Sequence, residues 1–125
     1  MISPTPAELE ILNILWNSGE AKTQAVNDEL NLLRPVGYTT TLKTMQIMTE
    51  KGLLGRHKDG KSHIYFPLID ESDTKSHLLD KIIQSTFGGS TSGLLMQLFG
   101  NKTVSQEEIV QIRAFLDDME DKHNG

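Results

Sequence analysis

Basic and hydroxyl side chains gather in one stretch of this chain, where together they could bind phosphate. Residues 34–66 contain six Lys or Arg and only two Asp or Glu, although the 125-residue chain has a formal net charge of -5. Phosphate binding depends on the local charge more than on the total charge. The basic side chains of this stretch are those of Arg34, Lys43, Lys51, Arg56, Lys58 and Lys61. They indicate contact with nucleic acid, and an ordinary solvated charged surface is the alternative.

The side chains give little indication of catalysis or metal binding. The chain has no Cys, which removes thiolate metal ligands and cysteine nucleophiles together. Its four His are scattered; only His57 and His63 could face one another across a hairpin, and two ligands are too few for a metal site. The acidic run at residues 117–121 is typical of a solvated helix end. We therefore expect neither an enzyme nor a bound cofactor or metal.

Two helices should precede the basic stretch. Residues 5–8 have the Thr-Pro-Ala-Glu pattern of a capping box, so the first helix should begin there. It should end at residues 18–19, because Gly commonly follows the last helical residue. The second helix should start near Thr23, be short and end before Arg34-Pro35, since the residue that precedes a proline avoids helical geometry. Its predicted buried face consists of Ala25, Val26, Leu30 and Leu33.

A third helix should run from Thr39 to Lys51, with Leu42, Met45 and Met48 facing inward at helical spacing. The opposite face is rich in threonine, although threonine is a poor helix former. A threonine hydroxyl can bond to phosphate or to base edges, and its methyl group can contact thymine. The side chains expected to face DNA are those of Thr39, Thr40, Lys43, Thr44 and Gln46. The alternative is that Thr39 is only the N-cap and that the other residues are neutral surface.

After the third helix the pattern changes to that of a β-hairpin. Residues 53–58 and 61–67 have an extended pattern, and Asp59-Gly60 between them predicts a two-residue turn. The basic side chains around its tip, which could contact the DNA backbone, are Arg56, Lys58 and Lys61. Three helices followed by a basic hairpin is the order of the winged helix-turn-helix, whose third helix enters the major groove. We therefore expect a first domain, residues 1–69, that binds double-stranded DNA.

The remaining residues, 70–125, are acidic and helical, and they form the second predicted domain. The pattern predicts helices over 70–87, 94–99 and 105–120, the last starting at a second capping box. Two copies of the chain could bury their apolar stripes across a two-fold axis, although a small separate core is the alternative. The expected fold class is mainly α with a small β-wing: a winged helix-turn-helix followed by a three-helix dimerisation region. The side chains expected at the dimer interface are Leu78, Leu79, Ile82, Ile83, Phe87, Leu95, Leu98, Ile112, Phe115 and Leu116.

Several short segments, in one order along nearly the whole chain, are similar to those of a known family. They are AELEIL at 7–12, LW at 15–16, RPVGYTT at 34–40, QIMTEKGLL at 46–54, YFP at 65–67, FGGS at 87–90 and SQEEI at 105–109. With them the chain resembles the penicillinase-repressor family of bacteria, which includes the methicillin-resistance regulator and the copper-transport repressors. The resemblance implies a homodimer with N-terminal winged helices and an interlocked helical C-terminal half. It also implies repression of an operon through a palindromic operator.

Three features of the sequence depart from what the resemblance implies. In the antibiotic-responsive branch, a membrane sensor triggers cleavage in the C-terminal half, and the corresponding bond here would lie near Gln97-Leu98. This pair differs from the Asn-Phe pair typical of that site. The copper-responsive branch carries a cysteine-rich metal hook near the C-terminus, and this chain has no Cys. Ile47 stands where many relatives carry Arg, which would remove one DNA contact.

The composition also bears on where the chain acts. No apolar run approaches the roughly 20 residues that a membrane-spanning helix needs, and the absence of Cys fits a reducing compartment. We therefore expect a cytoplasmic protein without membrane insertion. The functional alternative is a winged-helix protein-interaction module that does not bind DNA, in which the acidic C-terminal half docks a partner.

Overall fold

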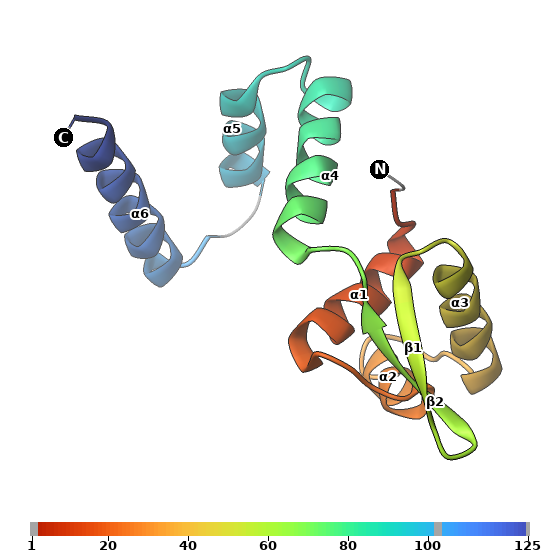
Figure 1. The fold of residues 1–125 in the computed structure, drawn as a ribbon. Coiled ribbons are helices and arrows are strands. Elements are labelled where there is room, and N and C mark those ends of the chain that lie inside the picture. Colours follow the sequence, from red (N-terminus) through yellow and green to blue (C-terminus); the bar gives the residue numbers. More distant parts are fainter. Residues whose placement is uncertain (1–2, 102–103, 125) are drawn as a thin grey trace. The chain divides into compact units, whose positions relative to one another are not determined.

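The computed structural model describes residues 3–101 and 104–124 (Figure 1). The chain separates into two compact units, Met1–Asp80 and Lys81–Gly125, each described by itself below. The expectation of a mainly α fold with a small β-wing is confirmed. The elements are α1 (Pro6–Ser18), α2 (Thr23–Leu30), α3 (Tyr38–Glu50), β1 (Leu54–Asp59), β2 (Ser62–Pro67), α4 (Glu71–Thr86), α5 (Thr91–Asn101) and α6 (Gln106–Asn124).

The predicted capping box opens α1. The backbone N–H of Glu8 donates to Oγ1 of Thr5 at 3.2 Å, and the N–H of Thr5 donates to Oε1 of Glu8 at 2.9 Å. These two bonds satisfy donors that the first turn of a helix would otherwise leave unpaired. The helix ends at Gly19, whose φ of 89° suits a residue without a side chain. Both predicted ends of α1 are therefore confirmed.

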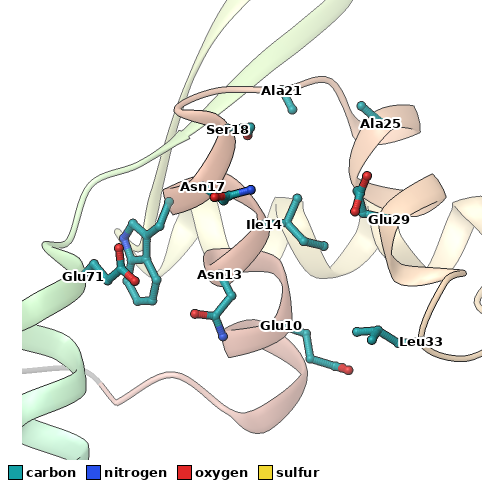
Figure 2. A pocket seen from close by; sticks show the side chains of 11 residues that line it. Glu10, Asn13, Ile14, Asn17, Ser18, Ala21, Ala25, Glu29, Leu33 and Glu71 are labelled. Atoms are coloured by element: carbon teal, nitrogen blue, oxygen red, sulfur yellow. The ribbon is translucent and has the colours of Figure 1, made fainter. Parts of the chain in front are cut away.

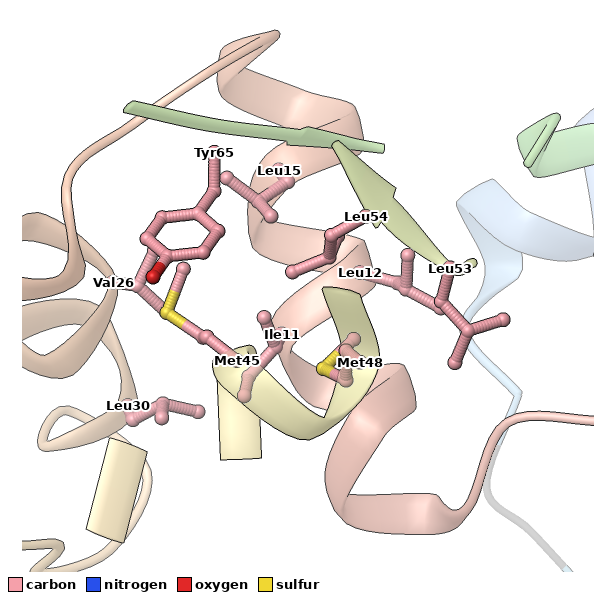
Figure 3. Packing of buried hydrophobic residues seen from close by; sticks show 10 residues of the cluster. All are labelled: Ile11, Leu12, Leu15, Val26, Leu30, Met45, Met48, Leu53, Leu54 and Tyr65. Carbon is pink, nitrogen blue, oxygen red and sulfur yellow. The ribbon is translucent and has the colours of Figure 1, made fainter. Parts of the chain in front are cut away.

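One apolar core holds the first unit together (Figure 3). It takes side chains from all three N-terminal helices and from both strands of the wing. A hairpin alone is marginal in water, so the wing depends on this shared core. Its members are Ile11, Leu12, Leu15, Val26, Leu30, Met45, Met48, Leu53, Leu54 and Tyr65. Burial of Tyr65 from β2 is accompanied by a short bridge to the α1–α2 connection, where Ala21 and Tyr65 exchange backbone hydrogen bonds of 3.0 and 2.9 Å.

The turn of the wing lies one residue later than the sequence predicted. Asp59 pairs with Ser62 across the antiparallel ladder, so the two loop residues are Gly60 and Lys61 rather than Asp59 and Gly60. Gly60 has φ of +65°, while Lys61 keeps a negative φ. A two-residue hairpin loop with Gly first and a single positive φ is the pattern of a type II′ turn, which matches the twist of the strands. Asp59 is thereby the last residue of β1.

The second helix is short and ends before Arg34-Pro35, as predicted, but its expected buried face is wrong at two positions. α2 ends at Leu30, because the side chain of Asn31 bonds to the carbonyl of Asn27 at 2.7 Å and to that of Val36 at 2.9 Å. The chain then turns, and Leu33 is left 68% exposed. Ala25 is exposed as well, since the buried face of α2 runs through residues 23, 26, 27 and 30.

In the second unit, α5 is longer than the predicted segment 94–99. The hydroxyl of Ser90 accepts from the N–H of Gly93 at 2.9 Å, so the helix starts at Thr91, and it continues to Asn101. The predicted second capping box opens α6: Glu108 N–H donates to Oγ of Ser105 at 3.1 Å. No residue of α5 is buried, although its mean composition is apolar. The apolar side chains of this unit therefore remain largely in contact with water.

Candidate nucleic-acid interface

A groove of about 520 Å³ separates α3 from the wing and is closed at one side by the start of α2. Arg56 and Lys61 of the wing, Gln46 of α3 and Lys22 of the α1–α2 connection lie along it. None of the described residues that line it is Asp or Glu. In Figure 1, α3 and the hairpin lie side by side in the first unit. The groove therefore combines cationic and hydrogen-bonding side chains on two neighbouring elements, as contact with a polyanion requires.

The predicted DNA-binding side chains fall into two groups. Gln46, Arg56 and Lys61 are exposed and line the groove together. The others are not among its lining residues: Thr39, Thr40, Lys43 and Lys58 are exposed, and Thr44 is half-buried. The hydroxyl of Thr44 donates to the carbonyl of Thr40 at 2.9 Å, so its oxygen still has room to accept a bond. Lys22, which also lines the groove, was not singled out from the sequence.

The alternative role of Thr39 as the N-cap of the third helix is wrong. The cap is Gly37, which offers no side-chain acceptor, and Thr39 lies inside the first turn. Tyr38 opens the helix and also lines the groove. The first-turn N–H groups of α3 therefore have no side-chain cap, and Thr39 is available on the outer surface.

A buried polar cluster between α2 and α3 sets where α3 lies. The side-chain amide of Asn27 donates to Oγ1 of Thr41 at 2.8 Å and to the carbonyl of Val36 at 3.0 Å. Asn31 closes the cluster, because its Oδ1 accepts from the N–H of Val36 at 3.1 Å. Asn27 is 6% exposed and Thr41 is 1% exposed, so these bonds are shielded from water. The sequence signal was an Asn beside Val26 on the buried face of a short helix, and it was missed.

The other end of α3 is joined to α1 by an ion pair. Nζ of Lys51 donates to both carboxylate oxygens of Glu8, at 2.8 and 3.0 Å. Burial acts to raise the pKa of Glu8, but the bonds from Lys51 and from the Thr5 backbone, with the Lys51 charge, outweigh it and leave this pKa below its ordinary value. The carboxylate therefore stays ionised inside the fold. Sequence reasoning had given Glu8 only its capping role.

An ion pair and a histidine–carboxylate contact join the wing to the α1–α2 connection. Lys22 pairs with Asp59 at 2.9 Å, and Nε2 of His57 lies 3.5 Å from a carboxylate oxygen of Glu20. The hydrogen bond from Lys22 lowers the pKa of Asp59. Asp59 is the one acidic residue in the sequence between 51 and 69, so this pairing neutralises the only negative side chain of the wing. The one acidic side chain of the hairpin therefore already has a cationic partner.

The predicted dimerisation side chains differ in exposure. Ile83 is buried and Leu78, Phe87 and Ile112 are half-buried. The exposed members are Leu79, Ile82, Leu95, Leu98, Phe115 and Leu116. Within the second unit, Phe99 of α5 and Ile112 of α6 line an apolar hollow of about 420 Å³. So much apolar surface in contact with water is unusual for a monomer.

Comparison with known proteins places the chain among bacterial repressors. Residues 4–118 match the family described as penicillinase repressor. The chain belongs to the penicillinase repressor family. This member is 30% identical over 115 residues to the penicillinase repressor of Bacillus licheniformis, covering 90% of this chain and 88% of the relative. It is 28% identical over 110 residues to the methicillin resistance regulatory protein MecI of Mammaliicoccus sciuri, covering 88% and 89%.

Solved structures agree with this assignment. The solution structure of the DNA-binding domain of the repressor BlaI is 33% identical, with a TM-score of 0.50, and the match covers 55% of this chain and 84% of that domain. A MarR mutant of E. coli complexed with operator DNA has a TM-score of 0.53 at 12% identity, covering 92% and 74%, and shares the fold alone. The resemblance stated from the sequence is confirmed, and the family is one of DNA-binding transcriptional repressors rather than enzymes.

Across residues 3–101 and 104–124, no helix combines the length and the apolar character needed to cross a membrane.

Proposed function

We propose that this member of the family is a transcriptional repressor that binds double-stranded DNA through α3 and the wing. In this proposal α3 enters the major groove with Thr39, Thr40, Lys43, Thr44 and Gln46. The wing, with Arg56, Lys58 and Lys61, follows the phosphate backbone. The observation that carries the proposal is the groove between α3 and the wing, which is lined by Lys22, Arg56 and Lys61 and by no acidic side chain among its described residues. DNA binding of this kind requires no cofactor in this proposal.

A mobility-shift experiment with the chain's own promoter region tests DNA binding. Arg56→Ala and Lys61→Ala should each weaken binding and reduce its dependence on salt, because each removes about one phosphate contact. Lys122→Ala on α6 is the matched control, since it removes the same charge from an exposed position far along the chain. No binding at low salt, or an equal loss in the control, would contradict the proposal. Salt-independent binding to a protein without DNA affinity would favour an interaction module instead.

We also propose that the repressor acts as a homodimer on a palindromic operator. The apolar side chains exposed on α4, α5 and α6 would pair with those of a second copy, with residues 70–125 as the dimerisation domain and 1–69 as the DNA-binding domain. Leu95, Leu98 and Phe115 are 45%, 40% and 65% exposed, which supports burial by a partner. Two linked copies bind two half-sites more tightly than one copy binds either. Analytical ultracentrifugation at micromolar concentration tests the dimer.

Release of repression by proteolysis belongs to the same proposal. The Gln97-Leu98 bond lies inside α5, and a protease needs an extended segment, so α5 has to open locally before cleavage. Local opening is favoured where few apolar contacts are buried, and α5 has no buried residue. A membrane sensor acting upstream, with the repressor itself in the cytoplasm, would supply the signal. Mass spectrometry of the repressor from induced cells would locate the cut.

A further inference from the structure

A second groove, of about 710 Å³, lies between α1 and α2 in the first unit (Figure 2). It shares no lining residue with the groove between α3 and the wing. Gln24 of α2 lines the latter groove, while Ala25 and Glu29 of the same helix line this one. The two grooves therefore use different sides of α2, and DNA bound to α3 and the wing leaves the α1–α2 groove available.

The lining side chains form two rows along the helices. On α1, Glu10, Ile14 and Asn17 follow one another at helical spacing. On α2, Ala25 and Glu29 lie four positions apart, and Leu33 lies in the turn after this helix. Figure 2 shows Ile14 pointing from α1 toward the α2 row. Two facing rows make an elongated trough, which suits a helix lying along it better than a compact ligand.

Part of the lining of this groove is apolar and includes small residues. Ala21 and Ala25 leave space that a larger side chain would fill, and Leu33, 68% exposed, adds apolar surface at one end. Trp16 also lines the groove and is held in place, because its Nε1–H donates to the carbonyl of Ile69 at 3.0 Å. An incoming helix therefore meets a preformed apolar surface, where leucine-sized anchors gain by burial.

Polar groups along the groove are available to a partner. Among the residues that the structure describes, no side-chain hydrogen bond or ion pair involves the amides of Asn13 and Asn17 or the carboxylate of Glu29. Two other carboxylates line the groove and already have partners, Glu10 with Arg34 and Glu71 with Lys75. Unpaired amides and a carboxylate beside an apolar surface can orient a bound segment.

Charge decides which occupant fits. Three Glu and no Lys or Arg are among the described residues that line this groove, the reverse of the groove between α3 and the wing. A phosphate backbone is repelled by it. A second copy of this chain is disfavoured too, because its exposed apolar helices lie in residues 70–125, which carry ten acidic and five basic residues. Glu10 and Glu71 are already paired with Arg34 and Lys75, so Glu29 is the carboxylate that attracts a cationic protein segment.

We propose that the groove between α1 and α2 binds an amphipathic helix of a partner protein, with apolar anchors on one face and Lys or Arg on its flanks. The anchors lie over Ala21 and Ala25 between Ile14 and Leu33. A flanking cation pairs with Glu29, and the amides of Asn13 and Asn17 bond to the polar edge of the helix. This binding site operates on the DNA-bound repressor as well as on the unbound one.

The test uses the full chain labelled with ¹⁵N and a synthetic helical peptide with leucines on one face and lysines on its flanks. We expect saturable shifts of the Trp16 indole N–H and of the Asn13 and Asn17 side-chain amides. The same peptide with Glu in place of each Lys should cause none. Glu29→Lys, and Ala25→Leu, which fills part of the groove, should each weaken binding by about tenfold or more.

Matched controls change the same side-chain types away from the groove. Asp28→Lys alters the same charge on an exposed position of α2, and Ala7→Leu enlarges an exposed alanine of α1. Both should bind the peptide as the unaltered chain does. Equal losses in the controls, shifts confined to residues 94–119, or binding of the acidic peptide would overturn the proposal. A fall in self-association in Ala25→Leu would also overturn it, because the occupant would then be a second copy. DNA binding by Glu29→Lys is measured separately, so its loss would not be confused with failure of this site.

Discussion

Lys51 donates two hydrogen bonds to the carboxylate of Glu8, at 2.8 and 3.0 Å, and so joins the end of α3 to the first turn of α1. Glu8 is 4% exposed, whereas the side chain of Lys51 is 35% exposed. Loss of the ion pair should therefore be more costly for the carboxylate of Glu8 than for the ammonium group of Lys51. A buried carboxylate needs its counter-charge, while the ammonium group can still reach water.

This asymmetry predicts that removing Lys51 destabilises the fold more than removing the charge of Glu8. Lys51→Met should lower the free energy of unfolding by about 3 kcal/mol, because it leaves an uncompensated buried carboxylate. Glu8→Gln should lower it by about 1 kcal/mol, since the amide keeps part of the hydrogen bonding and Lys51 turns to solvent. Urea unfolding followed by circular dichroism measures both. Equal midpoints for Lys51→Met and the unaltered chain would rule out the role given to this pair.

The same pair predicts a pH dependence of stability. Although burial acts to raise the pKa of Glu8, the bonds from Lys51 and Thr5 leave its folded-state pKa below the ordinary value of 4.5. A lowered folded-state pKa adds stability that is complete above the unfolded pKa and is lost as the pH falls through the folded pKa. The stability difference between the unaltered chain and Glu8→Gln should therefore be constant from neutral pH to about 4.5 and shrink below it. A difference that grew on acidification would contradict this sign.

The Asn27–Thr41 hydrogen bond predicts coupling between α2 and α3. Asn27→Ala and Thr41→Val each remove one partner of a bond shielded from water, and each should lower the free energy of unfolding by about 1–3 kcal/mol. The double variant should lose less than the sum, by about 1 kcal/mol, because the second change removes a group already left unpaired. A double-mutant cycle by urea unfolding measures this difference. Strict additivity would mean that the two side chains act independently.

Local signals in the sequence predicted most of the fold. The capping boxes at residues 5–8 and 105–108, the stop at Gly19 and the hairpin all rest on residues only a few positions apart, which interact wherever the chain folds. The start of α5 was missed and the exact last residue of α2 was not predicted, for a related reason. Asn31 and Ser90 bond to nearby backbone through side chains that are equally common in loops.

Contacts between distant residues could not be predicted. Glu8 and Lys51 are 43 positions apart and Asn27 and Thr41 are 14 apart, and one sequence does not say which polar side chains meet in the folded chain. The groove between α3 and the wing likewise combines residues that could be predicted locally with one that could not. Arg56 and Lys61 of the wing were predicted from local charge, whereas Lys22 joins the groove because the α1–α2 connection pairs with β2.

The exposed apolar surface of α6 predicts that one added charge prevents dimerisation. Phe115 is 65% exposed, and Phe115→Asp would place a carboxylate in the proposed interface without a partner. The dimer should weaken by about 2–4 kcal/mol, as expected when a central aromatic contact is lost. Gln111→Asp, exposed on the same helix, is the control. Sedimentation velocity gives the mass of each variant in solution. An intact dimer in Phe115→Asp would exclude this residue from the interface.

Replacing Ile47 by Arg should raise the affinity for DNA. The Ile47 side chain is 41% exposed on α3, one helical turn beyond Lys43, so a cation placed there would lie on the same side of the helix as Lys43. Ile47→Arg should therefore add one phosphate contact. The slope of log affinity against log salt should steepen by about one, and affinity should rise most at low salt. Ile47→Leu, which keeps the position apolar, should leave the slope unchanged. Fluorescence anisotropy with promoter DNA over a salt series measures both variants, and an unchanged slope in Ile47→Arg would mean that this turn of α3 faces away from the DNA.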